Sequence, residues 1–176
     1  ATYVMKISYN RGAQTYVCLL AAAAGADDCD AGLSEIGRIW ADAGLDTTGA
    51  ALVDGSGLSG NYVTPNNGVA AQEIMAKRPD AQRWRATMPI LGVDGSLAAV
   101  QSDSAAAGKV HAKTGTLVSG DLVNGRIRLS TKALGGVMES QSGRNLAFTV
   151  FMTQGFATDI EGVLTANDDV GAVAAA

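Results

Sequence analysis

The chain has 176 residues, 47% of them apolar and 17% charged, which is typical of a globular domain rather than a disordered segment. Its net charge is −4 and no cluster of Lys and Arg occurs, so nucleic acid is not an expected partner. No apolar run reaches the roughly 18–20 residues that are needed to span a bilayer. The composition therefore favours one domain with a sizeable core.

The first half of the chain has the pattern of helices. It opens at Ala1, without an initiator Met or a visible signal peptide, so we expect an internal fragment. Residues 11–24 are rich in alanine and predict a helix that ends at Gly25. Asp30 is a typical N-cap for a second, amphipathic helix, which Gly44 closes.

A loop and two further helices are predicted next. The Gly- and Ser-rich stretch 54–59 predicts a tight, irregular loop. Thr64 caps a third helix with Pro65 at its first position, and this helix extends to about Lys77. A shorter helical piece is expected around residues 82–88.

From residue 109 the pattern changes to strands. Residues 109–117 predict one strand, and Asn124-Gly125 is a hairpin signal between apolar residues. Segments 134–139 and 146–153 predict a second antiparallel pair, in which the later strand alternates cleanly between apolar and polar residues.

The order of these elements indicates an α+β fold. The tail, residues 164–176, predicts a helix with Asp168 and Asp169 near its start. We expect a mainly helical part over residues 1–108 and a part with antiparallel strands and the last helix over residues 109–176. Together they would form one structural domain.

Two short motifs carry residue types suited to catalysis. Lys113-Thr114-Gly115-Thr116 lies on a predicted strand, whose edge can offer N–H groups, hydroxyls and a positive charge to an acyl group and a carboxylate. Near the other end, Ser8-Tyr9-Asn10 leads into a helix. Taken alone, the first motif could be a solvated strand end and the second a helix cap.

Taken together, the two motifs resemble two of the three signatures of the penicillin-recognising serine hydrolases, Lys-Thr-Gly and Ser-x-Asn. The third, Ser-x-x-Lys, which holds the nucleophile, does not occur in this sequence. Residues 54–65 and 89–97 add two further motifs in the same order. With them, the chain from Met5 to about Gly155 resembles the D-alanyl-D-alanine carboxypeptidases among the class C, low-molecular-mass penicillin-binding proteins.

The resemblance implies the C-terminal part of the serine β-lactamase/DD-peptidase-like transpeptidase fold, with the nucleophile on an upstream segment or a second chain. It implies that Ser8 relays a proton to the leaving amine and that Lys113 supports this relay. Asn10 would bind the acyl side-chain amide of the substrate. The substrate-binding residues would be Thr114, Gly115 and Thr116, with both threonines on the terminal carboxylate and the N–H of Thr116 in the oxyanion hole.

The implied partners are peptidoglycan stem peptides that end in D-Ala-D-Ala, and β-lactams. The implied location is extracytoplasmic, in the periplasm or at the bacterial cell exterior. Because such a compartment is oxidising, a disulfide between Cys18 and Cys29 is favoured over two buried thiols. No cofactor is implied, and a chain with one His is a poor candidate for a Cys/His zinc site.

Some alternatives stay open at this point. A β-lactamase or esterase of the same fold is one, although the loop at 54–59 argues against it, and a non-catalytic peptidoglycan-binding module is another. Carboxypeptidase and endopeptidase activity are not distinguished. Residues 118–132 predict an extra hairpin inserted before 133–136, which departs from the family pattern. His111, the only histidine, is interpreted as a plain strand residue, since no Gly-x-Ser-x-Gly motif accompanies it.

Overall fold

The computed structural model describes all residues from 1 to 176. The helices are α1 (Thr2–Lys6), α2 (Asn10–Ala23), α3 (Asp30–Asp42), α4 (Pro65–Ala76), α5 (Ala81–Thr87) and α6 (Ile160–Ala175), and the strands are β1 (Ala50–Ala51), β2 (Tyr62–Val63), β3 (Val110–Asp121), β4 (Arg126–Glu139) and β5 (Asn145–Ala157). None of the helices is long and apolar enough to cross a membrane.

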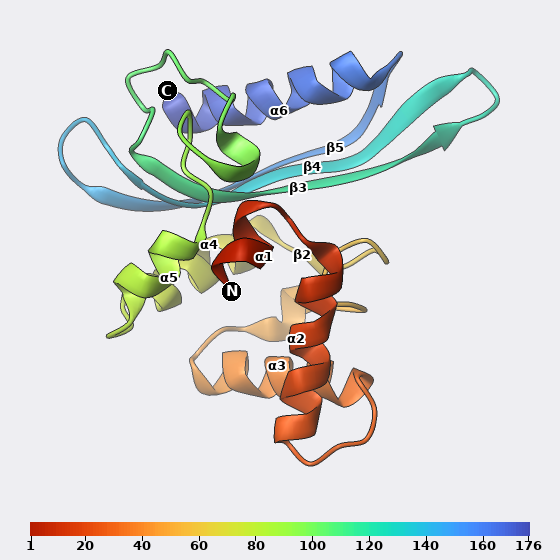
Figure 1. Ribbon diagram of the computed structural model, residues 1–176, viewed down its shortest axis with the longest axis vertical. Coiled ribbons are helices and arrows are strands. Elements are labelled where there is room, and N and C mark those ends of the chain that lie inside the picture. The colour runs from red at the N-terminus through yellow and green to blue at the C-terminus, as the bar shows by residue number, and fades with distance from the viewer.

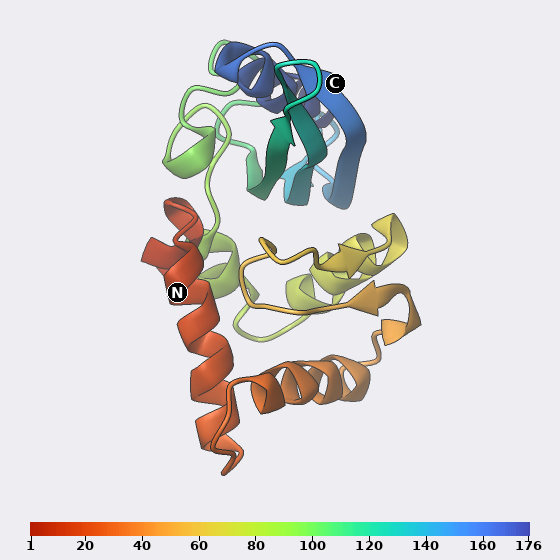
Figure 2. The same cartoon turned by 90° about the vertical axis from the view of Figure 1, so that its right-hand side faces the viewer.

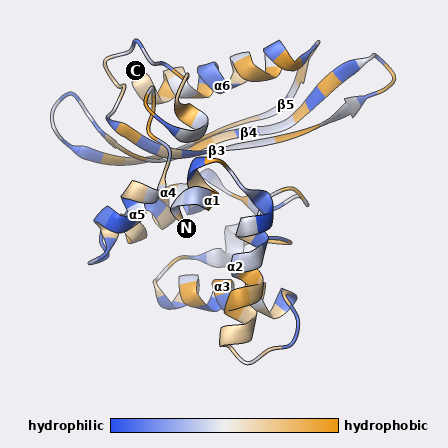
Figure 3. Ribbon diagram, viewed as in Figure 1, coloured by the Kyte–Doolittle hydropathy of each residue, from blue (hydrophilic) through white to orange (hydrophobic).

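The long strands form an antiparallel sheet in the order β3-β4-β5, and α6 lies across one face of it (Figure 1). The main core lies between them, where Val110 and Leu134 of the sheet pack with Val170 of the helix. Apolar and polar residues alternate along these strands (Figure 3), because successive side chains of a strand point to opposite faces. The predicted α+β class is confirmed.

The helices of the first half lie on the other side of the sheet (Figure 2). Helix α4 approaches β5 closely at Gly68, where an added Cβ would lie only 2.6 Å from the Thr149 hydroxyl oxygen. A side chain at that position would push the helix away from the sheet. This contact fixes the helical half against the strand that lies farthest from β3.

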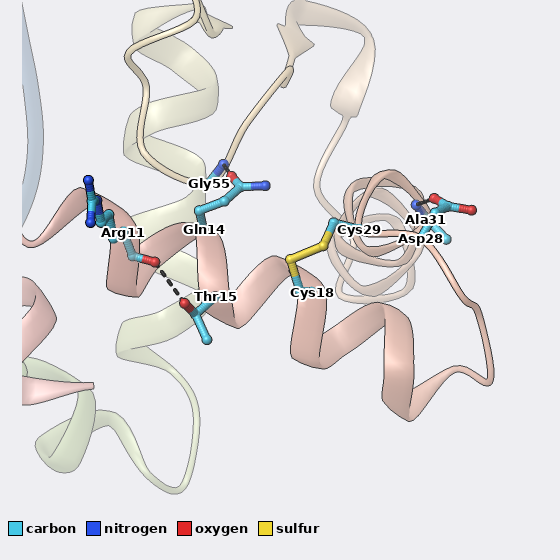
Figure 4. Close-up of a disulfide and its surroundings, with 8 residues drawn as sticks. All are labelled: Arg11, Gln14, Thr15, Cys18, Asp28, Cys29, Ala31 and Gly55. Carbon is cyan, nitrogen blue, oxygen red and sulfur yellow. Dashed lines mark hydrogen bonds between the residues drawn. A yellow bond between two sulfur atoms is a disulfide. The ribbon is translucent and has the colours of Figure 1, made fainter.

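Helices α2 and α3 form a pair that a disulfide joins, as Figure 4 shows between Cys18 and Cys29. The disulfide favoured from the sequence is therefore confirmed, and so are both helices. The expected N-cap is wrong: Asp30 is the first helical residue, and it is the Asp28 carboxylate that accepts a hydrogen bond from the Ala31 N–H at 2.9 Å. The N-cap position is Cys29, one residue earlier than expected, because the chain already has a helical conformation there.

Helix α4 begins as predicted, since the Thr64 hydroxyl accepts a hydrogen bond from the Asn67 N–H at 3.2 Å. The short helix expected around 82–88 is present as α5. Helix α1 was not predicted, because its five residues have no side-chain cap. The expected start of the last helix is wrong, because Asp159 caps α6 through the Gly162 N–H at 3.0 Å and places its start four residues earlier.

The extra hairpin expected at 118–132 is not present as a separate unit. Strands β3 and β4 run continuously through this region, with a register shift between Leu117 and Val118. The extension is stable because β5 continues beside it, where Leu129 pairs with Gly155. Leu129 also packs against Val163 of α6 in a second, smaller core. This segment therefore lengthens the hairpin that carries the Lys-Thr-Gly motif.

Candidate active site

A cleft of about 640 Å³ lies along the free edge of β3, beside the corner where α1 meets α2. The loop after β1 and the first half of α6 also contribute to its lining. All the residues that the sequence singled out for chemistry line this cleft: Ser8, Asn10, Lys113, Thr114, Gly115 and Thr116. Segments a hundred residues apart in the chain thus meet in one place.

Ser8 stands at the corner between α1 and α2 in a left-handed conformation, with φ of 57°. Such a conformation is uncommon for a residue with a side chain, and functional sites are where it tends to be kept. The alternative interpretation, in which this segment serves as a helix cap, is wrong for Ser8, because its hydroxyl does not cap α2. The hydroxyl instead accepts a hydrogen bond from Lys113 Nζ at 2.9 Å. Asn10, the first residue of α2, is exposed on the same side of the cleft.

The Lys113 ammonium is partly buried and has no acidic partner, since no carboxylate of the chain lies within 4 Å of it. It donates a second hydrogen bond to the carbonyl oxygen of Thr114 at 2.5 Å. Burial, together with the positive charge of Lys132, lowers the pKa of Lys113 to about 8. The pKa of this amine is therefore close to neutral pH, where the group can both bind and release a proton.

The edge of β3 offers its backbone to the cleft from Thr114 onward. Before Thr114, the edge of the strand is hydrogen-bonded to the segment around residues 89–91. The Leu91 N–H donates to Val110 O, and the Ala112 N–H donates to Pro89 O, both at 3.0 Å. Because backbone groups alternate in direction along a strand, the N–H groups of Thr114 and Thr116 also point to the free edge. They are well placed to donate to a bound acyl oxygen or carboxylate.

Two residues that the sequence analysis did not assign hold the threonine hydroxyls of this motif. Ser96 Oγ lies 2.9 Å from Thr114 Oγ1, and Lys132 Nζ donates to Thr116 Oγ1 at 2.7 Å. Ser96 belongs to the recognised stretch 89–97, which could have pointed to it. Lys132 had no such signal, because it lies in the segment interpreted as an extra hairpin.

Gly115 leaves room at the strand edge. A Cβ built on this residue would contact only the Ala133 side chain, at an ordinary 3.5 Å. Packing within the chain therefore does not require glycine here, which fits a position kept small for a ligand.

The loop that follows β1 forms one wall of the cleft, and Asp54 organises it. Its carboxylate accepts hydrogen bonds from the backbone N–H groups of Ser56, Gly57 and Ser59 at 2.5–2.8 Å. Partial burial alone would raise the pKa of Asp54, but the hydrogen bonds hold it far below its usual range. Gln14 of α2 also accepts a hydrogen bond from the Gly55 N–H at 2.8 Å, which ties the loop to the helix (Figure 4).

Asp54→Ala should therefore lower the free energy of unfolding of the protein that contains this chain by about 2–3 kcal/mol at pH 7. The exposed Asp27→Ala is the control and should have little effect. Because the folded-state pKa of Asp54 is depressed, the difference between wild type and variant should shrink as the pH falls below about 4. Urea unfolding at pH 7 and pH 3.5 measures this, and equal losses for the two variants would contradict the role given to Asp54.

His111 does not line the cleft. Burial, followed by the positive charge of Arg85, lowers the pKa of its ring. This agrees with its interpretation as a strand residue. The cleft chemistry therefore rests on lysines, hydroxyls and backbone N–H groups.

Comparison with known proteins identifies the family. The model of the D-Ala-D-Ala carboxypeptidase 3 (S13) family matches residues 2–175. The chain belongs to this family. Among its relatives, a D-alanyl-D-alanine carboxypeptidase of an Actinomadura species is 38% identical over 130 residues, which are 70% of this chain and 24% of that protein. The carboxypeptidase DacB of Mycolicibacterium smegmatis is 36% identical over 118 residues, 61% of this chain and 22% of that protein.

Solved structures agree with the fold. Penicillin binding protein 4 of Haemophilus influenzae, in complex with a β-lactam, aligns with a TM-score of 0.79 and 25% identity over 99% of this chain and 40% of that one. A second crystal structure of that protein aligns with a TM-score of 0.74. The chain therefore spans about a quarter of the length of its curated relatives and carries part of the family's architecture.

Proposed function

We propose that the chain supplies one side of the active site of a serine D-Ala-D-Ala carboxypeptidase or endopeptidase that acts on peptidoglycan peptides and is acylated by β-lactams. The observation that carries this proposal is the hydrogen bond from Lys113 to Ser8, which joins the Lys-Thr-Gly-Thr and Ser-x-Asn motifs across 105 residues of sequence. Membership of the family supports the same activity.

In this proposal the nucleophile is the serine of a Ser-x-x-Lys motif on an upstream segment or second chain. It attacks the carbonyl carbon of the penultimate D-Ala and forms an acyl-enzyme as the bond to the terminal D-Ala breaks. The lysine of the same motif takes the proton from the attacking hydroxyl, and this proton replaces the one that Ser8 gives up. Ser8 passes a proton to the departing amine, and Lys113 keeps the Ser8 hydroxyl in place through its 2.9 Å hydrogen bond. Asn10 binds the amide of the acyl group. Water then releases the acyl group, which restores the enzyme.

The edge of β3 completes the substrate site. The N–H of Thr116 donates to the oxygen on which negative charge develops, and the hydroxyls of Thr114 and Thr116 bind the terminal carboxylate. Gly115 lets the substrate backbone approach the strand. A β-lactam presents an acyl carbonyl and a carboxylate in a similar relation, so it would react with the same nucleophile. We place the enzyme in an extracytoplasmic compartment, which the Cys18–Cys29 disulfide supports.

Release of D-alanine tests this function directly. The enzyme that contains this chain with its Ser-x-x-Lys segment is incubated with an N-acetylated peptide that ends in D-Ala-D-Ala, and with the matched peptide that ends in L-Ala-L-Ala. We expect D-alanine from the first peptide and no cleavage of the second. Hydrolysis of β-lactams at a high rate without peptide cleavage would favour a β-lactamase, and no turnover of either would favour a non-catalytic binding module.

A further inference from the structure

Lys132 is a buried cation that lies beside the Lys-Thr-Gly-Thr motif. It is located on β4, directly opposite Thr116 in the register of the sheet, and only 5% of its surface is exposed. It shares a sheet face with Leu134, two residues on, which lies in the core under α6. Lys132 lines the cleft, and its ammonium donates a 2.7 Å hydrogen bond to the hydroxyl of Thr116, another lining residue.

The positive charge of Lys132 has no counter-ion within the chain. None of the ion pairs involves it, and no Asp or Glu lines the cleft, although the chain as a whole has a net charge of −4. The only charged residues in the lining are Lys113 and Lys132. Burying an ammonium without an opposite charge is unfavourable, so an anionic group of a ligand in this cleft would supply the opposite charge that Lys132 lacks.

The hydrogen bonds indicate which protons remain for such a ligand. Two of the three protons of Lys113 are used, by Ser8 and by the Thr114 carbonyl, whereas Lys132 uses one, toward Thr116. Because the Thr116 oxygen accepts from Lys132, its own hydroxyl proton is free to point into the cleft. Lys132 thus has two N–H donors left for a ligand. Its hydrogen bond to the Thr116 oxygen also leaves the Thr116 hydroxyl proton as a third donor.

We propose that Lys132 is a specificity-determining residue that, with Thr116, binds the free C-terminal carboxylate of the substrate. Lys113 then serves Ser8 and the proton relay, and Lys132 serves the carboxylate. This assignment rests on the proposed function, because it concerns the group of the D-Ala-D-Ala peptide that the strand edge receives. It predicts that the enzyme without Lys132 keeps its acyl-transfer chemistry and loses its preference for a free carboxylate.

The test compares two substrates with the same acyl group, in the enzyme that contains this chain and its Ser-x-x-Lys segment. One is the peptide ending in D-Ala-D-Ala, and the other is the methyl thioester of the same acyl-D-Ala, which has no carboxylate. Lys132→Met should lower kcat/KM on the peptide roughly 10- to 100-fold, mainly through KM, as expected for loss of a charged hydrogen bond. It should leave the thioester almost unaffected.

Three further variants complete the design. Lys132→Arg keeps the charge and should recover most of the loss on the peptide. Lys109→Met removes the same charge from an exposed position outside the cleft and should change neither substrate. Lys132→Gln repeats the test if the methionine variant does not fold. Equal losses on both substrates, or no loss on the peptide, would overturn the assignment of Lys132. A wild-type enzyme that cleaves neither substrate and is not acylated by penicillin would instead overturn the proposed function.

Discussion

Replacing Ser8 with alanine, in the enzyme that contains this chain and its Ser-x-x-Lys segment, should lower kcat/KM on a D-Ala-D-Ala peptide roughly 100- to 10,000-fold. The hydroxyl is the group that Lys113 holds at 2.9 Å, and without it the leaving amine has no positioned proton donor. Steady-state release of D-alanine measures the effect. Because the lost step is proton transfer, acylation by penicillin should slow as well.

Ser8→Gly separates the hydroxyl from the backbone. Ser8 has a φ of 57°, which glycine adopts without strain and alanine does not. If the hydroxyl matters, both variants should lose activity to a similar degree. A glycine variant with nearly wild-type activity would show that the alanine variant fails through its backbone, and the proton relay would have to be assigned to another group.

Lys113→Ala should lower kcat/KM on the same peptide by about 2–4 kcal/mol, roughly 30- to 1,000-fold. The variant removes the positive charge that holds the Ser8 hydroxyl and stabilises the transition state of the proton relay. The pKa of Lys113 is lowered to about 8, so this charge is present at pH 7 and is lost as the pH rises through 8. The difference between wild type and variant should therefore be largest below pH 7.5 and should narrow toward pH 9.

Lys109→Ala is the matched control for charge, because Lys109 is exposed and lies just before β3. It should retain nearly all activity at every pH. Equal losses for the two lysine variants would mean that only the overall charge of the protein matters. If the ratio of kcat/KM between wild type and Lys113→Ala does not change between pH 7 and pH 9, the ammonium of Lys113 does not titrate in this range and the prediction is wrong.

The parts of the fold that local signals determine were predictable from the sequence. Thr64 and Pro65 mark the start of α4, and Gly44 marks the end of α3, because caps and breakers act over one turn. Helix α1 lacks such signals. The continuity of β3 and β4 depends on pairing with β5, where Leu129 lies opposite Gly155, and no local pattern encodes that long-range contact.

The candidate site was predictable to the extent that its motifs are recognisable. The pairing of Ser8 with Lys113 followed from motif order, and the structure brings the two side chains together. Lys132 was not predicted, because its role depends on facing Thr116 across two strands. A lysine is usually a solvated surface residue, and only the structure reveals that this one is buried beside the cleft.

The position of the acyl group in the penicillin-treated enzyme is the most direct test of the role proposed for this chain. The enzyme that contains this chain is labelled with penicillin, digested with trypsin and analysed by mass spectrometry. We expect a single adduct, on the serine of a Ser-x-x-Lys motif outside these 176 residues, and much slower labelling in the Ser8→Ala variant. An adduct on Ser8, or on any other serine of this chain, would contradict the proposal that the chain supplies the proton relay and the substrate edge rather than the nucleophile.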